Sequence, residues 1–154
     1  MKGTRVLFLA SWVILFVVMA ATALLAALSL WRAYTEPQDN IAHGYTLEQV
    51  RATGGDEAVK AVRGRRATAA TWALGYALLG LVVVLVPYRR GERWAWWALL
   101  VSLGLSQGLS LLRAPMLETT HGAGAPAVLL ALTLLALLAA VPRFFRRETV
   151  ATVD

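Results

Sequence analysis

Six titratable residues in two polar segments could carry chemistry in this chain. Carboxylates and imidazoles bind divalent metals and transfer protons, and an arginine can hold an anionic headgroup. These residues are Glu36, Asp39, His43, Arg113, Glu118 and His121. No recognised metal-ligand spacing connects the two histidines, which lie far apart in the sequence. We interpret the six as solvated loop residues, with a ligand site on one face of the membrane as the alternative, and predict no catalytic residue, metal or cofactor.

A second pattern with possible chemistry is Gly104-Leu105-Ser106-Gln107-Gly108, which has the G-x-S-x-G spacing of serine hydrolases. In those enzymes the serine lies on a sharp turn between a strand and a helix, and a histidine serves as its base. Here the segment lies in the middle of an apolar run, and both histidines lie outside such runs. We therefore predict that Ser106 takes part in helix packing and not in catalysis.

The same run combines serines at every fourth position with a G-x-x-x-G pattern. Small residues at this spacing let two helices approach closely, and serine or glutamine side chains form hydrogen bonds across such contacts. The sequence therefore predicts that one face of this run is the internal packing seam of a bundle. The seam residues are Ser102, Gly104, Ser106, Gln107, Gly108 and Ser110.

Four apolar runs without a charged side chain must position these residues. They cover approximately 6–31, 67–88, 94–112 and 122–142 of the 154 residues. About 20 helical residues cross a hydrocarbon core roughly 30 Å thick, and lipid forces each run to satisfy its own backbone as a helix. The sequence predicts an all-α integral membrane protein, a four-transmembrane-helix bundle forming a single domain over residues 1–154.

The first run has a cleaved signal peptide as its alternative interpretation. Lys2 and Arg5 precede the run, and the small residues at 21–23 resemble a cleavage site. The apolar core of a signal peptide is about 7–15 residues long, whereas this run continues from Val6 to Trp31. We expect it to be retained as a membrane span.

The loop over residues 32–66 is expected on the outer side and is predicted to be partly helical. Thr46 and Gln49 have the spacing of a capping box, which marks a helix start. This helix should end at Gly54-Gly55, and a second helix should begin at Asp56 and continue to Pro87. We expect the second helix to project about two to three turns beyond the bilayer.

Basic residues predict the orientation of the chain. The net charge is +6, and short arginine clusters occur at 89–93 and 143–147, whereas the basic residues of 32–66 are mixed with acidic ones. By the positive-inside rule, these clusters predict that both termini are cytoplasmic. The membrane is expected to be a bacterial inner membrane. Tryptophans at 94, 96 and 97 mark the adjacent interface. The expected partners are anionic lipid headgroups, other membrane subunits or a homo-oligomer, and not nucleic acid.

The residue types that the spans lack exclude several activities. The chain has no cysteine, which excludes thiolate catalysis, iron–sulfur clusters with cysteine ligands and covalent haem attachment. Proton relays, buried haem and retinal need ionisable side chains at membrane depth, and the four predicted spans have none.

The segment over residues 87–96, PYRRGERWAW, resembles the short basic hairpin of small bacterial four-helix membrane proteins, including DoxX-like ones. This resemblance covers about ten residues, and any cytoplasmic turn before an aromatic belt produces a similar pattern. It implies a four-helix architecture and transfers no site residue.

These observations predict a non-catalytic membrane protein that acts as an accessory or scaffold component of a complex. The alternative is a protein or enzyme that binds a quinone, a lipid or another lipophilic molecule, with its polar site near Arg113, Glu118 and His121. A passive pore lined by the serines of the third run is a further possibility, and it would require the protein to oligomerise.

Overall fold

Four long helices make up nearly all of the described chain, which comprises residues 2–35, 40–42, 45–116 and 124–145 of a computed structural model. The helices are α1 (Lys2–Thr35), α2 (Leu47–Val83), α3 (Arg93–Met116) and α4 (Gly124–Phe144). Among the described residues these four are long and apolar enough to cross a membrane. The predicted all-α four-helix membrane bundle is therefore confirmed.

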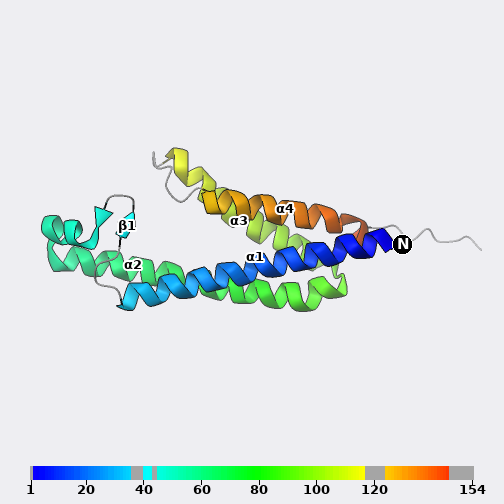
Figure 1. Ribbon diagram of the computed structural model, residues 1–154, viewed down its shortest axis with the longest axis horizontal. Coiled ribbons are helices and arrows are strands. Elements are labelled where there is room, and N and C mark those ends of the chain that lie inside the picture. The colour runs from blue at the N-terminus through cyan, green and yellow to red at the C-terminus, as the bar shows by residue number, and fades with distance from the viewer. Residues whose placement is uncertain (1, 36–39, 43–44, 117–123, 146–154) are drawn as a thin grey trace, which may run out of the picture.

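The helices pack in the spatial order α2, α1, α4, α3. Helix α1 contacts α2 and α4, α3 packs mainly on α4, and α2 and α3 make few contacts with each other. Figure 1 shows that the pair α3 and α4 diverges from the pair α1 and α2 towards one end of the molecule. We call this end, where α1 ends and α2 begins, the loop end, and we call the opposite end the hairpin end.

The segment between α1 and α2 contains a short strand pair that the sequence did not predict. Strand β1 (Asn40–Ala42) pairs antiparallel with β2 (Tyr45–Thr46), with Asn40 opposite Thr46. The prediction of a partly helical loop over residues 32–66 includes no strand, because turn-forming residues mark loops without specifying which backbone groups pair. The strand pair and the start of α2 extend beyond the ends of α3 and α4 (Figure 1).

The predicted capping box forms at the start of α2. The backbone N–H of Gln49 donates to Thr46 Oγ1 at 3.3 Å, and the backbone N–H of Thr46 donates to Gln49 Oε1 at 2.9 Å. The helix is then interrupted at Gly55, where φ is 70° and ψ is −173°. Glycine adopts this conformation without the Cβ clash that other residues meet. The predicted helix start and the predicted break at Gly54-Gly55 are both confirmed.

At the hairpin end, α2 continues through a π-helical turn, η1 (Val84–Tyr88), instead of ending at Pro87. Proline cannot donate a backbone hydrogen bond and its ring crowds the preceding turn, which a wider turn accommodates. The Trp12 indole N–H donates to the Val84 carbonyl in this turn, at 3.1 Å. The widened turn thus gains a partner from α1.

The helical backbone after η1 ends in a Schellman motif. Gly91 has a φ of 80°, its N–H donates to the Tyr88 carbonyl at 2.9 Å, and the N–H of Glu92 donates to the Pro87 carbonyl at 3.0 Å. This tight reversal sets α3 antiparallel to α2. The sequence identified the arginine hairpin but not the glycine that closes it.

Tyr88, the largest of the fully buried side chains among the described residues, lies towards the hairpin end. The fully buried Tyr88 ring lies 4.9 Å from the Phe144 ring and 5.8 Å from the Phe8 ring, measured between centroids. Its hydroxyl shares a 2.6 Å hydrogen bond with Ser11 Oγ. Residues from α1, η1 and α4 therefore meet at one aromatic group, which fixes this end of the bundle.

Candidate functional site

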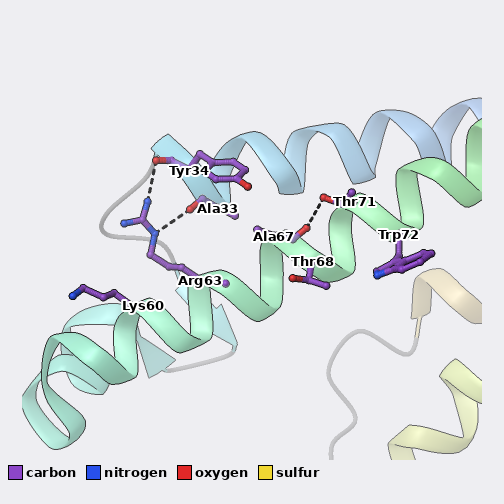
Figure 2. A pocket seen from close by; sticks show the side chains of 9 residues that line it. Ala33, Tyr34, Lys60, Arg63, Ala67, Thr68, Thr71 and Trp72 are labelled. Carbon is purple, nitrogen blue, oxygen red and sulfur yellow. Dashed lines mark hydrogen bonds between the residues drawn. The ribbon is translucent and has the colours of Figure 1, made fainter.

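A pocket of about 620 Å³ lies at the loop end, between the end of α1 and one face of α2 (Figure 2). Two of its residues come from α1 and the others from α2 at helical spacing, so the α2 residues share one face. The lining residues are Ala33, Tyr34, Lys60, Arg63, Gly64, Ala67, Thr68, Thr71 and Trp72. The volume falls within the roughly 300–1,000 Å³ of small-molecule sites.

Arg63 holds the two walls of the pocket together. Its Nε donates to the Ala33 carbonyl at 3.0 Å and its Nη2 donates to the Tyr34 carbonyl at 2.9 Å (Figure 2). These carbonyls belong to the last turn of α1, which lacks intrahelical donors and carries the negative end of the helix dipole. A single guanidinium therefore caps α1 and joins it to α2.

The pocket changes character along α2. Lys60 lies at one end, and Thr68, Thr71 and Trp72 lie towards the other, about 18 Å away at 1.5 Å per helical residue. None of the nine described lining residues is acidic. The arrangement can hold an anionic group beside Lys60 and Arg63 and an apolar group beside Trp72.

The candidate residues predicted from the sequence include none that lines this pocket, although the sequence carries a signal for it. Polar positions 60, 63, 68 and 71 recur at helical spacing on the helix expected from Asp56. The contact with α1 could not be inferred, because Arg63 binds backbone carbonyls, which every residue carries.

The arginines of the hairpin end contact aromatic rings and one carbonyl. Arg93 Nε donates to the Phe144 carbonyl at 2.8 Å. The Arg89 guanidinium lies 5.5 Å from the centre of the Trp12 ring, and that of Arg143 lies 5.8 Å from the centre of the Phe8 ring. These cation–π distances are within the usual 6 Å limit. The arginines therefore stabilise the bundle as well as carrying charge at its rim.

Most of the predicted outer-face ligand set lies outside the described residues, namely Glu36, Asp39, His43, Glu118 and His121. Arg113 lies in the last turns of α3. In the described part of the chain, no group of three or more His, Asp or Glu residues is placed to hold a metal ion.

The predicted seam of α3 needs correction in part, because leucines, and not Ser106 and Ser110, are the buried side chains that recur every four residues on this helix. Leu99 and Leu103 are buried, whereas Ser106 and Ser110 are exposed. The Ser106 and Ser110 hydroxyls donate to carbonyls of their own helix, those of Leu103 and Ser106, at 3.2 and 2.8 Å. Leucine buries more apolar surface than serine at the same spacing, which accounts for this rotation of the helix.

The remaining seam residues occupy different sides of α3. Gln107 is buried beside the leucines, and Ser102 is half-buried. Gly104 lies two residues before Ser106, which is roughly 200° of rotation, so the glycines and serines occupy different flanks. A Cβ added to Gly104 or Gly108 would meet no atom within 4 Å. Ser106 Oγ also lies 3.4 Å from the Oη of Tyr76 on α2.

Comparison of the chain with models of protein families, with characterised proteins and with solved structures gives no match. The function must therefore be argued from the geometry of the molecule.

Proposed function

We propose that the protein is a non-catalytic scaffold component of a membrane assembly, and that α3 packs against the α3 of a second copy. The uncovered glycine flank of α3 supports this proposal. Gly104 and Gly108 lie on a membrane-spanning helix with open space above both, in a spacing that lets helix backbones approach closely. Neighbouring Val101 and Leu105 are 59% and 61% exposed and would extend such a contact.

A second copy is the partner that this flank fits best. A two-fold axis brings the same patch of both subunits together, so a small-residue pattern on one helix meets the same pattern on the other. Lipid chains fit poorly into the groove above two glycines, whereas a second helix gains dispersion contacts there. The charge-free spans are consistent with a structural role, because they supply no carboxylate, histidine, lysine or arginine for chemistry in the membrane.

We further propose that the hairpin end faces the cytoplasm of a bacterial cell and contacts anionic headgroups. Arg89, Arg90 and Arg93 lie within one short turn at this end, and Arg143 lies at the end of α4. Such short basic clusters favour the cytoplasmic side of a membrane.

Cysteine cross-linking tests the proposed self-association, since the natural chain has no cysteine to interfere. Leu105→Cys and Ser106→Cys are adjacent, at similar depth and both exposed, but only Leu105 borders the glycine flank. In oxidised native membranes we expect Leu105→Cys to form a covalent dimer and Ser106→Cys to remain monomeric. Adding Gly108→Leu to Leu105→Cys should abolish the dimer, because the new side chain separates the helices.

Equal cross-linking of both variants would indicate random collision and contradict the proposal. Absence of a dimer for Leu105→Cys would also contradict it, provided that the free thiol reacts with a maleimide. The fraction of Leu105→Cys that forms the covalent dimer should be independent of expression level over a severalfold range. A dimer that arose from crowding in the membrane would instead increase with expression.

A further inference from the structure

We propose that the loop-end pocket binds the phosphate headgroup of an anionic membrane phospholipid, with an acyl chain lying along α2 beside Trp72. This inference is independent of the proposed self-association, because it concerns α1 and α2 and not α3. It rests on three features of the pocket: its charge, its change from polar to apolar along α2, and the absence of a side chain at Gly64.

The charge of the pocket favours a phosphate. Lys60 and Arg63 line one end, and no carboxylate accompanies them among the nine lining residues. The two carbonyl bonds of Arg63 use Nε and Nη2, which leaves the Nη1 hydrogens for a ligand and holds the guanidinium in one orientation. An orientation fixed before binding lowers the entropy cost of holding an anion.

Lys60 is available to the same ligand. Its Nζ lies 2.7 Å from Glu57 Oε1, but the two side chains are 70% and 86% exposed. Ion pairs this exposed contribute little stability, so exchange of Glu57 for a phosphate costs little. The phosphate would then have one rigid and one flexible cationic partner.

The other end of the pocket suits a lipid chain. Ala67, Thr68, Thr71 and Trp72 belong to the first turns of the apolar part of α2. Trp72 is 77% exposed, and tryptophan favours the boundary between headgroups and chains. The pocket extends about 18 Å along α2, whereas the headgroup layer on one side of a bilayer is only roughly 5–8 Å thick. A pocket this long therefore reaches from the charged surface to the acyl chains.

Gly64 keeps the middle of the pocket open. It lies on the lining face of α2, and a Cβ placed on it would meet no atom within 4 Å. A larger side chain here would enter the pocket without a clash, and leucine favours a helix more than glycine does by roughly 1 kcal/mol. Gly64→Leu is therefore expected to fold and to fill the pocket while both cations remain.

The test measures lipid bound to the purified full-length protein in mild detergent, by native mass spectrometry. The probe is dioleoyl phosphatidylglycerol, with dioleoyl phosphatidylcholine as the zwitterionic reference. We expect Gly64→Leu to weaken phosphatidylglycerol binding about tenfold, the loss of roughly 1.4 kcal/mol. The matched control is Gly75→Leu, on the same helix but outside the pocket, where an added Cβ also meets nothing within 4 Å.

A charge-matched pair gives a second measurement. Lys60→Gln with Arg63→Gln should weaken phosphatidylglycerol binding at least as much as Gly64→Leu does. Arg51→Gln with Arg65→Gln removes the same charge from the same helix outside the lining and should leave binding close to that of the natural protein.

Three results would overturn the proposal. The first is equal phosphatidylglycerol binding by Gly64→Leu and Gly75→Leu, which would place the lipid elsewhere. The second is equal binding of phosphatidylcholine and phosphatidylglycerol, which would remove the role of the cations. The third is displacement of the lipid by millimolar inorganic phosphate, which would make the site one for free phosphate and not for a phospholipid.

Discussion

The smallest residue at the contact between α1 and α2 determines how closely these helices approach. A Cβ built on Gly80 would fall on the sulfur of Met19, closer than real Cβ atoms come to any neighbour. Met19 is itself 1% exposed and belongs to the main apolar core, so it has little room to move. The contact therefore depends on glycine at position 80.

We expect Gly80→Val to destabilise the protein by about 1–3 kcal/mol, the usual cost of overpacking a filled core. Thermal unfolding in detergent, followed by circular dichroism, measures the effect. The control is Gly75→Val on the same helix, where an added Cβ meets open space. Combining Gly80→Val with Met19→Ala should restore part of the loss. Equal melting temperatures for the two valine variants would contradict this account.

Single side chains also explain why the site was harder to predict than the spans. Arg63, Arg93 and Trp96 each donate to a backbone carbonyl of another helix. A carbonyl is present at every position, so the sequence contains no pattern that identifies the partner. Thr46 and Gln49 differ because both members of the capping box are side chains at a fixed spacing.

At the scale of elements, the capping box tests whether the start of α2 is stabilised locally. Thr46→Ala removes the hydroxyl that accepts from Gln49, which costs about 1 kcal/mol at a helix start. We expect faster amide hydrogen exchange over residues 47–54, measured by mass spectrometry, and unchanged exchange in α3 and α4. The break at Gly55 should confine the effect to this first segment.

Thr53→Ala is the matched control, since the Thr53 hydroxyl bonds carbonyls of its own helix and caps nothing. It should leave exchange over residues 47–54 unchanged or slower, because alanine favours a helix more than threonine does. Faster exchange in this control than in Thr46→Ala would show that the capping box does not hold the segment.

For the single elements, the sequence could not determine how each helix is rotated about its own axis. In α3 both Leu99-Leu103 and Ser102-Ser106-Ser110 recur every four residues, so periodicity alone favours neither face. In a membrane-spanning helix the lipid-facing side is also apolar, and the usual contrast between a polar and an apolar face is missing. The contacts with α4 select the leucines.

At the scale of the whole molecule, orientation can be measured directly. We expect a single cysteine at Ala52, near the loop end, to react with a membrane-impermeant maleimide on bacterial spheroplasts. A single cysteine at Gly3, at the hairpin end, should react only after the membrane is permeabilised. Both positions are exposed, and no natural cysteine contributes a background. The reverse labelling pattern would contradict cytoplasmic termini.

The number and type of the helices were predictable, because continuously apolar runs of this length satisfy their backbone hydrogen bonds in lipid by forming helices. The order in which the helices pack could not be predicted in this way. Two helices joined by a short hairpin are expected to pack against each other. Helix α2 leads directly into α3 through the turn at Gly91, yet α3 packs mainly on α4. Side-chain fit between surfaces decides such pairings, and hydropathy does not report it.

The packing of α3 mainly on α4 determines when the bundle can assemble during synthesis. A ribosome delivers the helices from the N-terminus, and α1 can pair with α2 as soon as both have entered the bilayer. Helix α3 arrives next, but its main partner has not yet been made. It must wait in lipid until α4 emerges and packs between it and α1. Helix α4 is therefore the one that joins α3 to the pair formed by α1 and α2, so these four helices can complete their packing only after α4 has been synthesised.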